Sequence, residues 1–315
     1  MSKLFILLGA LCMIFCCSDT RFFIHPKSPK IVLITIDGTR WQDIYDGPTP
    51  LDYPRQYTSQ QLVPNLYKHF VSGGMAIGKE SQALIKGPAH ISMPSYLEIM
   101  RGYPSLDCLN NYCRTNNKPT LVNSFPHQSA VFAGWDTIAK VFDTQLAVTN
   151  IGKNIRSDSW SRLGLPEHPV EQDDFESNEY RPDLYTELSA IEYLKQEQPQ
   201  FLWISLGDTD EWAHQGNVLM YWASLHMTDL FIGKLVEILD SNTVFIICPD
   251  HGRSDNFRDH GWDAASGRVW IMMRGPGIPN SGFVKYNRDV YLADIMSTVL
   301  ELTSGTHSAR SLLHQ

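Results

Sequence analysis

Two apolar runs of this chain each end in residue types that bind metal ions. Ile31–Ile36 is followed by Asp37, and Phe245–Cys248 is followed, after one proline, by Asp250 and His251, each time with a glycine next. Short apolar runs that stop at turn formers are typical of buried strands in parallel sheets, which place ligands at their carboxyl ends. We therefore expect these three side chains at one sheet edge, where carboxylate and imidazole donors suit zinc or manganese better than calcium.

Asp210 and His214 form a second candidate pair, which follows the apolar run Phe201–Leu206. Their spacing of four residues places both side chains on one face of a helical turn, where they could bind one ion. Taken alone, the pair could equally be part of a solvated acidic loop. His260, which lies in a polar loop nine residues after His251, adds a third ligand type and favours a second metal-binding group.

Ser92 is the candidate nucleophile. It lies two residues before Pro94, and proline suits the first turn of a helix because its missing N–H costs nothing there. A serine at a helix N-terminus is close to free backbone N–H groups that favour an anion, so Ser92 could attack phosphorus once a metal ion activates it. The alternative is that Ser92 serves only as the N-cap of that helix.

The elements that must position these residues alternate along the chain. We expect strands at 31–36, 129–134, 201–206, 245–250 and 269–273, and helices at 63–70, 92–100 (ending at Gly102), 183–195 (capped by Asp183), 216–239 and 289–303. Within 216–239, the predicted buried face is Met220, Ala223, Met227, Leu230 and Leu235. The polar stretch 152–182 is expected to be a long surface excursion. This order predicts an α/β fold with a mainly parallel central sheet and helices on both faces.

Length and charge restrict the possible functions. The chain has 315 residues, 43% of them hydrophobic, and we expect a single catalytic domain over residues 31–315. The net charge of −8 argues against nucleic-acid binding through a basic face. It does not exclude a phosphorylated substrate, because bound metal ions can invert the local field.

The first 17 residues are predicted to be a signal peptide, with 18–30 as a linker. Lys3 precedes a mostly apolar run that is shorter than the roughly 20 residues needed to span a membrane. The end of the run loosely resembles a bacterial lipoprotein signal, with Cys17 as the residue that would be lipidated. This predicts export to the periplasm or cell envelope, with membrane attachment if Cys17 is modified; the alternative is an ordinary signal cleaved a few residues later.

Three cysteines lie beyond that segment. Cys108 and Cys113 stand five apart in a polar loop and could form a disulfide in an exported protein, or could be two unrelated thiols. Cys248 lies within a predicted strand, where it is expected to be a small core residue.

The order of these motifs resembles the alkaline phosphatase superfamily, in particular its nucleotide pyrophosphatase/phosphodiesterase-like branch. The resemblance covers residues 31–275, and the segment 292–300 is also typical. It rests on five motifs in the family's order, namely Asp37-Gly38, Ser92-Met93-Pro94, Asp210 with His214, Asp250-His251-Gly252, and His260. The resemblance implies two divalent metal ions, zinc or alternatively manganese. One would be held by Asp37, Ser92, Asp250 and His251, and the other by Asp210, His214 and His260.

The function implied is that of an exported two-metal hydrolase of small-molecule phosphoric esters, monoesters or diesters, acting through a phosphoserine intermediate at Ser92. A sulfate- or phosphonate-ester hydrolase on the same site is the first alternative, although Tyr96 stands where the sulfatase maturation motif has arginine. A lipid-anchored binding protein with little turnover is the second. The branch's phosphate-binding asparagine has four candidates that the sequence does not separate, Asn110, Asn111, Asn116 and Asn117.

Overall fold

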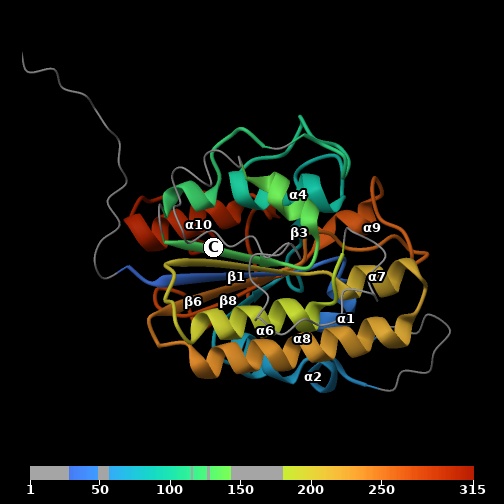
Figure 1. Ribbon diagram of the computed structural model, residues 1–315, viewed down its shortest axis with the longest axis horizontal. Coiled ribbons are helices and arrows are strands. Elements are labelled where there is room, and N and C mark those ends of the chain that lie inside the picture. The colour runs from blue at the N-terminus through green and yellow to red at the C-terminus, as the bar shows by residue number, and fades with distance from the viewer. Residues whose placement is uncertain (1–27, 49–56, 115, 126–127, 143–179) are drawn as a thin grey trace, which may run out of the picture.

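A seven-stranded sheet forms the centre of the protein (Figure 1). The computed structural model describes residues 28–48, 57–114, 116–125, 128–142 and 180–315. In spatial order the strands are β4 (Ser129–Ala133), β5 (Phe201–Leu206), β1 (Lys30–Ile36), β6 (Thr243–Cys248), β8 (Ile271–Arg274), β2 (Met75–Ile77) and β9 (Gly282–Phe283). The first four strands run parallel, whereas β8 is antiparallel to both β6 and β2. The predicted α/β fold with a mainly parallel sheet is confirmed.

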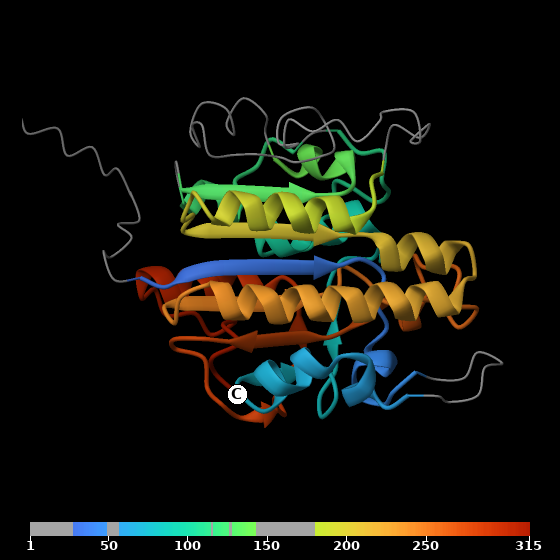
Figure 2. The same ribbon diagram turned by 60° about the horizontal axis from the view of Figure 1, so that its bottom comes forward.

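Strand β1 lies in the middle of the parallel part and sets the position of its neighbours' ends. Ile36 pairs with Leu206 of β5, and Thr35 pairs with Cys248 of β6. The three strands therefore end side by side at one edge of the sheet (Figure 2). The residues that follow them emerge together at that edge, as expected for ligands of a parallel sheet.

Helices cover both faces of this sheet. Helices α4 (Ser92–Arg101) and α10 (Asp294–Ser304) pack on one face, and α6 (Asp183–Leu194) and α8 (Val218–Ile238) on the other (Figure 1). Ile31 and Leu33 belong to the first core, and Val32 and Ile34 to the second, as the alternation of side chains along a strand requires. Shorter elements complete the fold, namely α1 (Trp41–Tyr45), α7 (Asp208–His214), α9 (Ala264–Gly267), and the 3-10 turns at Leu121–Ser124 and Asp136–Val141.

The buried face predicted for α8 is wrong at four of five positions. Met220, Ala223, Met227 and Leu230 face solvent, and of the predicted set only Leu235 is buried. The face that packs on the sheet contains Tyr221, Trp222, Leu225, Phe231 and Ile232. Because apolar residues occur almost all round this helix, their spacing alone does not identify the side that meets the core.

A second sheet of three short strands was not predicted. It consists of β10 (Val290–Tyr291), β3 (Ala83–Leu84) and β7 (Arg268–Val269). It divides the predicted strand 269–273 between β7 and β8. The closing helix, predicted to begin at residue 289, begins at Asp294, because Val290 and Tyr291 pair with β3 instead.

Two further helix predictions need correction. The segment predicted as one helix at 63–70 is divided into α3 (Pro64–Leu66) and a π-helical turn at Tyr67–Val71, and a further short helix, α2 (Ser59–Leu62), precedes it. Asp183 does not cap α6, since it is already the first helical residue and Pro182 is the N-cap. Its carboxylate instead accepts hydrogen bonds of 2.7 and 2.9 Å from the backbone N–H groups of Gly207 and Asp208, just before the catalytic-type residues of α7.

The cysteine alternatives are resolved, since Cys108 and Cys113 form a disulfide and Cys248 is a buried free thiol. The predicted signal peptide, Cys17 and most of the stretch 152–182 lie outside the described residues. Within the part of the chain that the structure describes, no helix has both the length and the apolar content needed to cross a membrane.

Candidate metal centre

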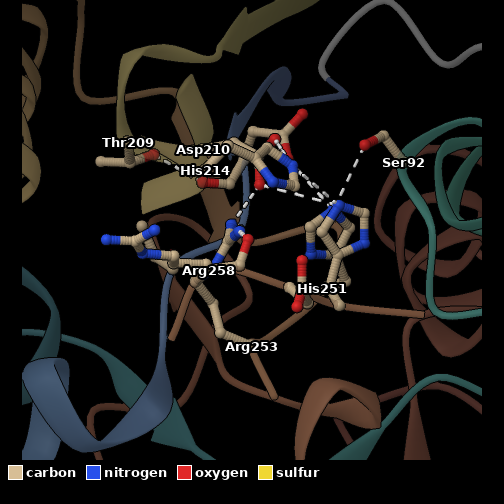
Figure 3. A network of polar contacts seen from close by, with 12 residues as sticks. Ser92, Thr209, Asp210, His214, His251, Arg253 and Arg258 are labelled. Carbon is tan, nitrogen blue, oxygen red and sulfur yellow. Dashed lines mark hydrogen bonds and ion pairs between the residues drawn. The ribbon is translucent and has the colours of Figure 1, made fainter. Parts of the chain in front are cut away.

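The structure brings all seven predicted metal-binding residues together at the carboxyl edge of β1, β5 and β6. Four of them, Ser92, Asp210, His214 and His251, are labelled in Figure 3. The seven residues come from five parts of the fold. Asp37 follows β1, and Asp250 and His251 follow β6, while Ser92 begins α4. Asp210 and His214 lie on α7, and His260 lies in the loop before α9.

The first donor group surrounds the His251 ring. Its Nε2 atom lies 3.3 Å from Asp37 Oδ1, 3.4 Å from Asp250 Oδ2 and 3.2 Å from Ser92 Oγ. The ring's other nitrogen, Nδ1, donates a 2.8 Å hydrogen bond to the Gly252 carbonyl, which fixes the ring with Nε2 toward the three oxygens. A histidine oriented in this way through its second nitrogen is typical of metal ligands.

Two buried carboxylate oxygens of this group have no hydrogen-bond partner among the described residues, Asp37 Oδ1 and Asp250 Oδ2. The second oxygen of each carboxylate is satisfied. Asp37 Oδ2 accepts from the Tyr96 hydroxyl at 2.8 Å, and Asp250 Oδ1 accepts from the Gly38 and His251 backbone N–H groups at 3.0 and 2.8 Å. Unpaired buried carboxylate oxygens are costly, so two of them facing the same Nε2 atom fit a bound cation.

The second donor group consists of Asp210, His214 and His260. Asp210 Oδ2 lies 3.1 Å from His214 Nε2, as the spacing of four residues on α7 predicts. His214 Nε2 in turn lies 3.2 Å from His260 Nε2. The His260 ring is fixed by a 3.0 Å hydrogen bond from Nδ1 to the carbonyl of His90. Three donor atoms thus converge in the arrangement expected of a zinc-type site.

The two groups adjoin each other. Donor atoms of Asp37, Asp210 and His251 all lie within 4.8 Å of one another, and the His251 and His260 rings stack with centroids 3.7 Å apart. Thr209 strengthens this junction, because its hydroxyl donates a 2.5 Å hydrogen bond to the backbone carbonyl of Asp37. The start of α7 is therefore fixed directly to the end of β1 (Figure 3).

Arg253 is a component that the sequence did not predict. Its guanidinium is buried, forms an ion pair with Asp210 Oδ1, and also donates to the backbone carbonyls of Phe257 and Arg258. Gly38 makes room for this pair. It has a φ of +62°, and a Cβ there would lie 2.5 Å from both Arg253 Nη1 and Asp210 Oδ1. Only glycine suits that backbone conformation and that space.

The concentration of charge shifts the pKa values of this centre. Burial raises the pKa of Asp37, and the nearby carboxylates of Asp250 and Asp210 raise it further. Burial of His251 opposes its protonation, but the charges of the three carboxylates outweigh burial and raise the pKa to about 9. The pKa of His260 falls to about 3, because of burial and because of the positive charge on His251. Without metal, the site thus retains protons to offset its own negative charge.

Ser92 is not an N-cap, so the alternative role considered for it is wrong. It is the first residue of α4, and the N-cap position belongs to Ile91, which makes no side-chain capping bond. Ser92 is 4% exposed, with its hydroxyl directed at His251 (Figure 3). Of the four candidate asparagines, Asn111 lies beside it, because its Oδ1 accepts a 3.0 Å hydrogen bond from the Met93 backbone N–H. The Cys108–Cys113 disulfide encloses Asn111 in a short loop.

Tyr96 is a second component that the sequence did not predict. It lies one turn after Ser92 on α4 and is 1% exposed, with its hydroxyl donating to Asp37. Burial raises its pKa well above the usual value, so the hydroxyl stays a donor. Asp208, the first residue of α7, has a carboxylate that accepts hydrogen bonds from the Tyr180 hydroxyl and from the backbone N–H of Asp183.

Comparisons with known proteins agree with this geometry. Residues 177–304 match the family model described as the metalloenzyme superfamily. This match includes α7, β6 and their ligand-type residues, and it confirms the predicted resemblance at the level of the superfamily. No curated protein sequence matches the chain.

Solved structures with the same fold are distant in sequence. A phosphonate monoester hydrolase of Agrobacterium radiobacter is 13% identical, with a TM-score of 0.56 over 89% of this chain and 78% of its own. A 2-O GAG sulfatase is 14% identical, with a TM-score of 0.58 over 90% of this chain and 73% of its own. A protein of the alkaline phosphatase superfamily from Vibrio parahaemolyticus is 14% identical, with a TM-score of 0.58 over 90% of this chain and 67% of its own. These similarities establish the fold.

Proposed function

We propose that this chain, whose residues 177–304 match the metalloenzyme superfamily, is a two-metal hydrolase of phosphoric esters with Ser92 as its nucleophile. The observation that supports this most directly is the position of the Ser92 hydroxyl. It lies 3.2 Å from His251 Nε2, beside two buried carboxylate oxygens that have no hydrogen-bond partner among the described residues. A serine in that place would lie beside a cation bound by those two oxygens.

The donor groups fit two divalent ions. One would be held by Asp37, Asp250 and His251 together with Ser92, and the other by Asp210, His214 and His260. Zinc agrees with the mixture of imidazole and carboxylate donors, and manganese is the alternative. When bound, the ions would lower the pKa of the Ser92 hydroxyl and offset negative charge on the phosphoryl oxygens and the leaving group.

The reaction follows from where Ser92 sits. Its hydroxyl loses a proton, Oγ forms a bond to phosphorus, and the bond from phosphorus to the ester oxygen breaks in line with the attack. The departing alkoxide takes up a proton and leaves as an alcohol. Water then attacks phosphorus from the side that the alcohol has left, opposite Oγ. The water gives up a proton as the bond to Oγ breaks, and Oγ takes up a proton, which returns Ser92 and releases phosphate or a phosphate monoester. The positive end of the α4 dipole favours the negative charge during both steps.

Sulfate or phosphonate esters are the second candidate substrates. This candidate is supported by neighbours named as a sulfatase and a phosphonate monoester hydrolase. One observation argues against a sulfatase. The sulfatase maturation motif has an arginine where this chain has Tyr96, and the Tyr96 hydroxyl donates a hydrogen bond to Asp37. A phosphate or phosphonate ester needs no modified residue, because the Ser92 hydroxyl itself can attack phosphorus.

We also propose that the protein is exported, with Cys17 as a lipid attachment site. The Cys108–Cys113 disulfide supports export, since such bonds persist in oxidising compartments. Mass spectrometry of the native protein is the test. Loss of Met1 to Cys16 with a diacylglycerol adduct on Cys17 is expected, whereas an intact Met1 would contradict export.

The proposed activity is tested with matched aryl esters. Protein loaded with zinc or with manganese is assayed on an aryl phosphate, a bis-aryl phosphate and an aryl sulfate. We expect turnover of a phosphate ester that a chelator abolishes and added metal restores. Faster turnover of the sulfate would favour the second candidate. Metal binding without turnover of any ester would favour a binding protein.

A further inference from the structure

The C-terminal segment folds back along α10 and is fixed there. Leu312 is buried, and its backbone N–H donates a 2.8 Å hydrogen bond to the hydroxyl of Thr298. Arg310 donates to both carboxylate oxygens of Asp294 at 2.8 and 2.7 Å. These contacts bring the last residues of the chain beside the end of α10, where Glu301 lies.

Three metal-binding residue types converge at that place. Glu301 Oε1 lies 3.1 Å from His307 Nδ1 and 2.9 Å from His314 Nε2. All three donor atoms lie within 4.8 Å of one another, and the two ring centroids are 4.6 Å apart. His307 follows the left-handed turn at Gly305, and His314 follows a second turn at residues 312–313, so two separate turns direct their rings at one carboxylate oxygen.

Hydrogen bonding alone accounts poorly for this convergence. The side chains of His307 and His314 are 70% and 44% exposed, so water offers both rings the same bonds at no ordering cost. Glu301 is largely buried, with 14% of its side chain exposed. Within the described residues its only ion-pair partners are these two histidines.

We propose that Glu301, His307 and His314 bind one zinc ion, at a site separate from the catalytic centre. Two imidazole nitrogens and one carboxylate are a common set of protein ligands for zinc, with water in the remaining position. Each ring can present the required lone pair by carrying its proton on the other nitrogen. The ion would join His314 to α10 and so hold the C-terminal segment in place. This inference does not depend on the proposed function.

The test compares zinc binding by the full-length protein and a double variant, His307→Ala/His314→Ala. Isothermal titration against a competing chelator should show one fewer zinc ion per chain in the variant, with turnover of an aryl phosphate unchanged. The matched control is His69→Ala/His226→Ala, which removes two histidines that contact Arg274 and the Leu62 carbonyl instead. The control should bind as many zinc ions as the unmodified protein.

Hydrogen exchange gives a second readout that is independent of catalysis. Zinc should slow exchange of the backbone amides of residues 306–315 at least tenfold in the unmodified protein, and not in Glu301→Gln or in the double variant. Unchanged zinc stoichiometry and affinity in the double variant would overturn the proposal. So would exchange of this segment that does not respond to zinc in the unmodified protein.

Discussion

Replacement of Ser92 by alanine separates a chemical role from a structural one. The change removes one buried hydroxyl whose contact in the described structure is with His251 Nε2 at 3.2 Å. Ser92 makes no capping bond, so the variant should lose only the free energy of one hydrogen bond, about 1 kcal/mol of unfolding free energy. If Ser92 is the nucleophile, turnover should fall by at least about a thousandfold, equivalent to about 4 kcal/mol of activation free energy.

The assay combines turnover of an aryl phosphate with metal content measured on the same sample. Because the other six ligand-type residues remain, Ser92→Ala should keep most of its metal while losing activity. Ser92→Thr should retain partial activity, because its hydroxyl can occupy the same place. The matched control is Ser95→Ala on the same helix, where the hydroxyl is fully buried and has no hydrogen-bond partner among the described residues. This control should leave turnover unchanged.

Wild-type turnover in Ser92→Ala would refute the covalent mechanism, and direct attack by activated water would replace it. A loss of turnover accompanied by loss of metal would show that Ser92 acts mainly as a ligand. An equal loss in Ser95→Ala would show that the fold of α4, rather than the Ser92 hydroxyl, determines the rate.

Three further outcomes are expected. Gly38→Ala should abolish most turnover, because the new methyl group collides with the Arg253–Asp210 ion pair. Gly305→Ala is the control, since Gly305 also has a positive φ but has no atom within 4 Å of the added Cβ. This control should cost only about 1 kcal/mol of unfolding free energy in a denaturant titration. Tyr96→Phe should weaken metal affinity by about 10- to 100-fold in a chelator competition, whereas Tyr45→Phe, also a buried tyrosine but one that donates to the Ile77 carbonyl, should not. The metal-free protein should lose stability between pH 6.5 and pH 9, because the pKa of His251 is raised to about 9 in the folded state and its stabilising contribution disappears as the pH rises through that value. Urea midpoints of chelated protein that do not fall over this range would contradict the last expectation.

The convergence of the seven candidate ligands could be expected from the sequence because most of them directly follow a buried strand or lie on one helical turn. The ends of β1 and β6 had to coincide once the strands were parallel neighbours, so Asp37, Asp250 and His251 could be placed without coordinates. The components that were missed act across the fold. Arg253 resembles any loop arginine until its ion pair with Asp210 is seen, and Tyr96 resembles any helix tyrosine until α4 packs over β1.

The errors in the fold have a related cause. Helix α8 is apolar on nearly every side, so the choice of its buried face depends on the elements that it meets, which periodicity does not reveal. The late start of α10 depends on the pairing of Val290 and Tyr291 with β3, more than 200 residues earlier in the chain. Such long-range pairing between two-residue strands leaves almost no local signal.

The central position of β1 has a consequence for how this protein is made. Ile31 pairs with Phe201 on one side and with Val244 on the other. Strand β1 therefore cannot pair until these partners, which lie about 170 and 210 residues later in the chain, have been synthesised. Contacts so distant in sequence are slow to form, and both edges of β1 remain open for pairing with other chains in the meantime. The growing chain therefore passes through a long period of exposure to aggregation. The metal centre, which needs the ends of β1 and β6 together, can assemble only when that period is over.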